Sequence, residues 1–76
     1  MKKKVCVDVW NDFYPERMDE LVKLLEQGEM VWIYVNCTGN TRAEIVKGMY
    51  LNELKRLFRE RLKEKSVDCT ECYYLE

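Results

Sequence analysis

Hydrophobic and polar residues alternate strictly near the start of the chain, over residues 4–10. A period of two is typical of a β-strand, because successive side chains of a strand point to opposite faces of the sheet. Residues 30–36 repeat this alternation and predict a second strand. Residues 67–74 are rich in β-branched and aromatic side chains, which predicts a third strand.

The two segments between these strands carry apolar residues at helical spacing instead. Pro15 suits the first position of a helix, and Gly28 suits the left-handed position that follows one, so we expect a helix between them. A second helical pattern runs from Thr41 to about Lys65. Gly48 lies inside this pattern and marks a bend or a close backbone contact, because glycine weakens a helix interior.

The predicted elements follow the order β-α-β-α-β. Helical crossovers join parallel strands, so the first two strands are expected to be parallel. We therefore predict a small α/β domain with a three-stranded, mainly parallel sheet, in which the direction of the third strand stays open. The chain of 76 residues has room for a single domain over residues 1–76. Its last two residues, Leu75 and Glu76, are a candidate remnant of an expression vector.

The charge and the hydropathy of the chain indicate which partners and which cellular compartment to expect. Lys and Arg total 13 against 14 Asp and Glu, a net charge of -1, so no overall field attracts nucleic acid and we expect no nucleic-acid partner. No segment has the length and apolarity of a membrane span or a signal-peptide core. The expectation is a cytoplasmic protein with reduced thiols and no membrane contact.

Metal and acid–base chemistry are both disfavoured by the residue types present. The chain has no His, which removes the commonest general base and a frequent zinc ligand. A zinc site would then need all four cysteines, but Cys6 and Cys37 lie about five residues apart along parallel strands, or ~16 Å. Zinc–sulfur bonds of ~2.3 Å do not span that distance. We expect no metal, no disulfide, no cofactor, no catalytic residue and no enzymatic activity.

The face of the first two strands opposite the valines is aromatic and needs a cover. Either the second helix covers it, with strand order 2-1-3 as in doubly wound folds, or a second subunit does. The apolar stripe of the second helix is wider than the roughly 100° of a helix with one buried face, which favours the second subunit. The sequence thus predicts a small non-enzymatic interaction module that self-associates as a homodimer. The predicted interface consists of Trp10, Trp32, Tyr34, Leu51, Phe58 and Leu62.

An alternative function follows from the turn after the second strand. Open parallel sheets bind ligands beyond the carboxyl ends of their strands, and the free N–H groups of a helix start can hold a phosphate there. Arg42 would add a charged donor, although the carboxylate of Asp12 would repel a phosphate unless a cation bridged them. The alternative is a binder of a phosphorylated small ligand or nucleotide. Its predicted residues are Asn11, Asp12, Thr38, Gly39, Asn40, Thr41 and Arg42.

Two short segments resemble motifs of known families. The string Ile33–Thr41 resembles the phosphate loop of flavodoxins, in which a strand runs into a Thr-Gly-Asn-Thr turn that holds the flavin phosphate. In flavodoxins this loop follows the first strand of a far longer chain, whereas here it follows the second. The string Val7–Phe13 resembles the first strand of isochorismatase-like hydrolases, whose Asp, matched here by Asp8, belongs to a catalytic Cys-Lys-Asp set. The remaining parts of either fold do not fit into this chain.

Overall fold

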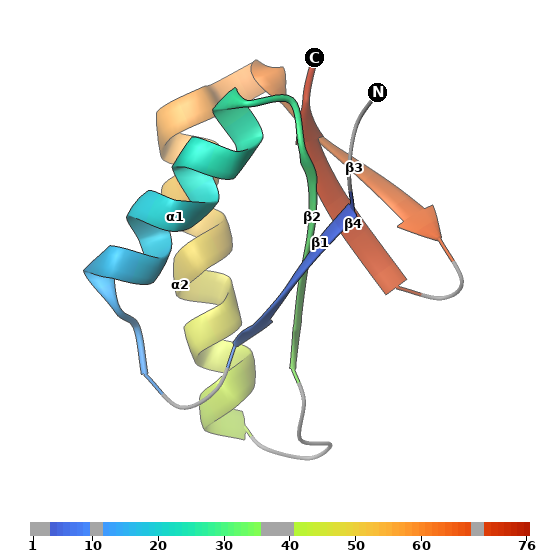
Figure 1. Ribbon diagram of the computed structural model, residues 1–76. Coiled ribbons are helices and arrows are strands. Elements are labelled where there is room, and N and C mark those ends of the chain that lie inside the picture. The colour runs from blue at the N-terminus through green and yellow to red at the C-terminus, as the bar shows by residue number, and fades with distance from the viewer. Residues whose placement is uncertain (1–3, 10–11, 36–40, 68–69) are drawn as a thin grey trace.

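The chain folds as strand, helix, strand, helix and terminal β-hairpin, as the computed structural model in Figure 1 shows. The structure describes residues 4–9, 12–35, 41–67 and 70–76. In chain order the elements are β1 (Lys4–Val9), α1 (Pro15–Glu26), β2 (Met30–Val35), α2 (Thr41–Phe58), the single 3-10 turn η1 (Arg59–Arg61), β3 (Leu62–Val67) and β4 (Thr70–Leu75).

The strands form one mixed sheet in the order β1-β2-β4-β3 within the described part of the chain. β1 and β2 are parallel, with Lys4 opposite Met30. β4 is antiparallel to both of its neighbours, and Trp32 of β2 lies opposite Cys72 of β4. The predicted fold class, a three-stranded and mainly parallel sheet, is therefore wrong. The sheet has four strands, and two of its three strand pairings are antiparallel.

The error comes from the segment after α2. The helical pattern predicts a helix to about Lys65, but α2 ends at Phe58 and β3 begins at Leu62. Arg59 adopts φ 52°, the left-handed conformation that usually requires glycine, and this residue turns the chain out of the helix. Leu62 then pairs with Leu75, which packs against the core as part of β4. Long-range strand pairing thus overrides the local helix propensity of this segment.

Both helices cover the same face of the sheet (Figure 1), so the molecule has two layers. The alternative in which α2 covers the opposite face, with strand order 2-1-3, is wrong. The buried core between the layers draws on α1, α2 and three strands. Its residues are Val7, Met18, Leu21, Leu25, Val31, Ile33, Val46, Tyr50, Leu54, Phe58 and Tyr73.

Two of the three glycines lie in the described part of the chain, and Gly28 fills its predicted role. Gly28 has φ 85° and follows the end of α1, where the N–H of Glu29 bonds to the carbonyl of Leu24, so the predicted helix end is confirmed. Apart from the adjacent residues and the backbone of its own helix turns, a Cβ placed at Gly48 would meet no described atom within 4 Å. The predicted close backbone contact at Gly48 is therefore absent among the described residues.

Candidate functional site

The segment that follows β1 is tied to the middle of α2. The fully buried hydroxyl of Tyr50 accepts a hydrogen bond from the backbone N–H of Tyr14 at 2.8 Å and lies 3.5 Å from the backbone oxygen of Asp12. The ring of Phe13 lies against that of Tyr50, with centroids 4.6 Å apart. Apolar and polar contacts at one tyrosine thus position the carboxyl edge of β1 beside α2.

Asp12 also meets the first turn of α2. Its Oδ1 accepts a hydrogen bond from Nη2 of Arg42 at 2.8 Å, in an ion pair whose side chains are both more than half exposed. The structure therefore brings together two residues of the predicted phosphate site, and Thr41 begins the same helix. A carboxylate already occupies one side of the Arg42 guanidinium, so a phosphate would compete with it. This alternative stays a prediction, because Asn11, Thr38, Gly39 and Asn40 lie outside the described residues.

The predicted interface residues of β2 lie on the sheet face that carries no helix. Val31 and Ile33 point into the core, so Trp32 and Tyr34 point to the opposite face. Trp32 is only 7% exposed, and Cys72 on the neighbouring strand is fully buried. This part of the helix-free face is already covered within the chain. Trp10 lies outside the described residues.

The other described residues of the predicted interface lie on the helix-covered side of the sheet instead. Phe58 belongs to the buried core, and Leu51 and Leu62 are partly buried against it. Since Trp32 and Tyr34 occupy the opposite side of the sheet, the described members of the predicted interface do not form one continuous surface. The wide apolar stripe of α2 is explained in part by these contacts to the core.

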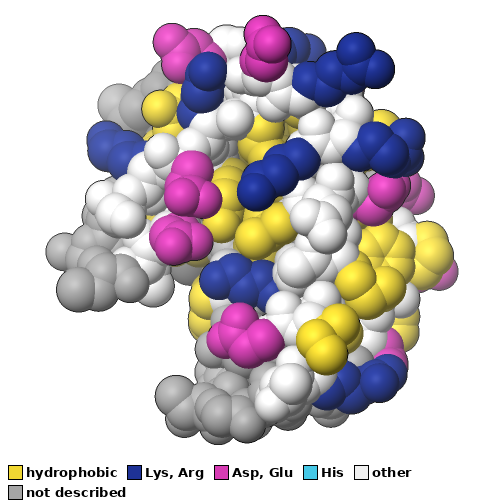
Figure 2. Space-filling view, turned by 180° about the vertical axis from the view of Figure 1, so that it is seen from behind, with side chains coloured by type: hydrophobic (Ala, Val, Ile, Leu, Met, Phe, Trp, Pro, Cys, Tyr) yellow, Lys and Arg dark blue, Asp and Glu magenta, His cyan; other side chains and the backbone are white. Residues whose placement is uncertain are grey.

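Among the described residues, most of the exposed large hydrophobic side chains belong to α2 and are not part of the predicted interface. On α2 the exposed fraction is 61% for Ile45, 45% for Met49 and 47% for Leu57. It is 48% for Tyr14, whose backbone N–H donates a hydrogen bond to α2. In Figure 2 hydrophobic side chains reach the surface between acidic and basic ones. The helical spacing of Ile45 and Met49, to one side of the buried stripe, was the signal in the sequence that could have identified this surface.

An ion pair flanks this surface near the end of α2. The guanidinium of Arg56 donates from Nε and Nη2 to the two carboxylate oxygens of Glu53, each at 2.8 Å. This two-pronged hydrogen bond lowers the pKa of Glu53, since it favours the charged carboxylate. Both side chains are exposed, so the pair mainly neutralises local charge and adds little stability.

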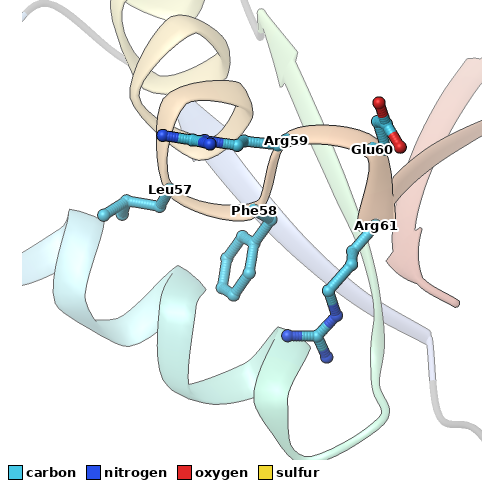
Figure 3. A pocket seen from close by; sticks show the side chains of 5 residues that line it. All are labelled: Leu57, Phe58, Arg59, Glu60 and Arg61. Atoms are coloured by element: carbon cyan, nitrogen blue, oxygen red, sulfur yellow. The ribbon is translucent and has the colours of Figure 1, made fainter.

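A hollow of about 460 Å³ opens where α2 ends and is lined by Leu57, Phe58, Arg59, Glu60 and Arg61 (Figure 3). The guanidinium of Arg61 lies 5.9 Å from the centre of the Phe58 ring, within the range of a cation–π contact. Arg59 extends away from Arg61 in Figure 3, so the two cations do not converge on a common point. The hollow therefore lacks the paired donors that would hold an anion.

Tyr73 places a phenol among carboxylates on β4. Burial raises the pKa of its hydroxyl, and the hydrogen bond that it donates to Oε2 of Glu71, at 3.1 Å, raises the pKa further. The charge of Glu64, on the neighbouring strand, acts in the same direction. The Tyr73 hydroxyl thus stays protonated and serves as a hydrogen-bond donor.

The cysteines and the potential metal ligands of the chain are considered next to the membrane-spanning potential of its helices. Cys72 is a free and buried thiol, whereas the side chains of Cys6, Cys37 and Cys69 lie outside the described part of the chain. Among the described residues, no three His, Cys, Asp or Glu side chains come together as a metal site, and no helix has the length and apolarity of a membrane span.

Protein-family models, curated proteins and solved structures all give no match to this chain.

Proposed function

We propose that the protein is a small, non-enzymatic interaction module of the cytoplasm that self-associates as a homodimer through the outward surface of α2. The observation that supports this most is the distribution of exposed large hydrophobic side chains in the described residues. Ile45 and Met49 lie one turn apart on α2, and Tyr14 is held against the same helix. Burying them against a second subunit removes apolar surface from water.

The charges around this surface favour a second copy as the partner. A two-fold interface brings a surface against itself, so an unbalanced charge there would meet the same charge. Here Asp12 neutralises Arg42, and Glu53 neutralises Arg56. The net charge of the whole chain, -1, adds little repulsion between copies.

The proposed interface does not include the aromatic sheet face. Trp32 and Cys72 are already buried within one chain, so covering them again would gain little. Met49 and Ile45 are about half exposed or more and have more surface to bury. The outward surface of α2 therefore offers the larger gain from association.

The test is the solution mass of the full chain, measured by sedimentation equilibrium from micromolar to millimolar concentration. The expected result is a reversible dimer that Met49→Glu weakens at least ~10-fold, since a charge would be buried at the contact. Leu57→Glu is the matched control, because Leu57 is equally exposed on the same helix but lies about 80° around it from Met49. A wild-type monomer over the whole range would overturn the proposed function, and equal effects of the two substitutions would overturn its location.

A further inference from the structure

Gly48 lies inside α2, the longest helix of the described chain, and nothing in its own subunit requires a glycine there. It occupies the middle of α2, away from both ends, where glycine costs about 1 kcal/mol relative to alanine. Gly28, at φ 85°, is the described glycine with a positive φ, so Gly48 is not required by backbone conformation. A Cβ at Gly48 would meet no atom within 4 Å, so it is not required by close packing within the chain.

An uncharged row of residues borders Gly48 on one side of the helix surface, and Glu44 lies on its other side. Spacings of three and four residues place Ile45, Gly48 and Asn52 on one face, with Met49 beside them. This face is opposite to the one that buries Tyr50 and Leu54. The chain is 36% charged, yet this row contains no charged residue over two turns, from Ile45 to Asn52, and Arg42 and Arg56 lie one turn beyond its ends. A glycine flanked by apolar side chains allows a second helix to approach closely.

We propose that α2 packs antiparallel against α2 of a second copy, across a two-fold axis near Gly48 and Met49. This inference rests on the proposed self-association and specifies its geometry. The absent side chain of Gly48 lets the two helix backbones come close, and Ile45 and Met49 fill the space on either side. A glycine that weakens the isolated helix thus strengthens the pair.

The charges on one flank of the row favour the antiparallel direction. Glu44 and Lys55 are eleven residues apart, so they lie within about 20° of each other around the helix and near its opposite ends. Neither forms an ion pair with another described residue. An antiparallel two-fold pair sets Glu44 of one copy beside Lys55 of the other, and it does so twice.

A parallel pair would use these charges less well. It would set the flank of Glu44 and Lys55 against the opposite flank of the partner helix, where Arg42 and Arg56 already have carboxylate partners. The antiparallel arrangement instead pairs Glu44 with Lys55, neither of which has an ion pair in the described part of the chain. The dipoles of the two helices are also opposed in this arrangement, which is the favourable direction.

The first test is Gly48→Ala, which should change two measurements in opposite directions. At a concentration at which the monomer dominates, the melting temperature should rise by about 4–8 °C, because alanine favours the helix. The dissociation constant of the dimer should increase about tenfold, because the new methyl group separates the helices. Glu20→Ala, on the exposed side of α1, is the control and should leave the dissociation constant unchanged.

The second test uses a mixture of isotope-labelled and unlabelled wild-type chains and needs no substitution. Isotope-filtered NMR should show intersubunit contacts from the methyl groups of Ile45 to Met49 and Asn52 of the other copy, and no contact of Ile45 with its own counterpart. A dimer in which Ile45 contacts its own counterpart, or one that Gly48→Ala leaves equally tight, would overturn this inference while the proposed self-association through α2 stands. A dimer without contacts at α2 would overturn this inference and the proposed interface together. A wild-type monomer would overturn both.

Discussion

The two helices end in the same backbone conformation but with opposite residue types. α1 ends at Glu26 and is followed by Gly28 with φ 85°, while α2 ends at Phe58 and is followed by Arg59 with φ 52°. Glycine adopts this conformation without steric cost, whereas a residue with a Cβ loses about 1–2 kcal/mol. The end of α1 is therefore a local property of the sequence. The end of α2 has to be stabilised by contacts made elsewhere in the fold.

Those contacts belong to the terminal hairpin. β3 and β4 pair along their whole lengths, from Leu62 opposite Leu75 to Val67 opposite Thr70. Phe58 is buried in the core directly before the turn, and the N–H of Glu76 bonds to the carbonyl of Arg61 directly after it. Strand pairing on one side and burial on the other offset the strain at Arg59.

The outward surfaces of the two helices differ as well. The exposed residues of α1 include Glu16, Asp19, Glu20, Lys23 and Glu26, which is the usual polar surface of a helix with a single buried face. The exposed surface of α2 includes Ile45, Met49 and Leu57 instead. α1 buries its apolar side within its own subunit, whereas α2 keeps apolar surface exposed for a second contact.

The largest expected effect concerns the link between the two helices. Tyr50→Phe removes the hydroxyl that accepts the N–H of Tyr14 just before α1, and the part-buried N–H loses its partner. We expect a loss of about 1–3 kcal/mol in the free energy of unfolding, measured by urea denaturation. Tyr14→Phe is the control, since the exposed hydroxyl of Tyr14 makes only a 3.5 Å contact with Asp12. Equal stability of the two variants would show that the link to α2 contributes nothing.

The next prediction tests the end of α1. Gly28→Ala should lower the free energy of unfolding by about 1 kcal/mol, because the new Cβ strains the left-handed backbone while meeting no neighbour. Gly48→Ala is the matched control in the monomer, where the same added methyl group should raise stability by a similar amount. Chemical denaturation of both variants measures the difference. A gain from both substitutions would contradict the strain argument.

The reciprocal change tests the end of α2. Arg59→Gly should raise the free energy of unfolding by about 0.5–1 kcal/mol, because glycine removes the strain at φ 52°. The greater conformational freedom of glycine in the unfolded chain offsets part of this gain. Arg59→Ala keeps a Cβ and should give no such gain. If alanine stabilised the protein as much as glycine, the side chain of Arg59, and not its backbone, would be the source.

The smallest effect concerns the exposed ion pair of α2. The lowered pKa of Glu53 means that its stabilising contribution is present above the ordinary value of 4.5 and is lost as the pH falls through the lowered value. Glu53→Gln should therefore leave thermal stability at pH 7 almost unchanged and slightly flatten its decrease under acid conditions. High salt should remove even this difference, because exposed ion pairs are screened. A large loss at neutral pH would show that the pair supports the fold.

Residue periodicity predicted the elements of the first half of the chain correctly. The strand over residues 4–10, the helix from Pro15 and the strand over residues 30–36 correspond to β1, α1 and β2, and the first two strands are parallel as expected. It failed after α2, where residues 62–67 have the composition of a helix but form β3. Helix propensity is local, whereas the pairing that makes β3 a strand comes from residues 70–75.

The candidate sites, like the fold, could be predicted from the sequence only in part. The sequence indicated that polar residues gather where β1 ends and α2 begins, and Asp12 does meet Arg42 there. The exposed surface of α2 was not identified, because Leu51 and Phe58 belong to the same wide stripe as Ile45 and Met49. Helical spacing shows which residues share a side, but not how far the neighbouring sheet and helix cover them.

Sequence alone determined where the chain changes from strand to helix, because alternation, Pro15 and Gly28 act through the backbone of a few neighbouring residues. The tertiary structure decided which face of the sheet both helices cover, where α2 stops and which hydrophobic side chains stay exposed. The end of α2 depends on the insertion of β4 between β2 and β3, because β3 pairs with β4 from Leu62 onward. That arrangement joins residues far apart in the chain, and its free energy comes from pairing and burial that no local pattern contains.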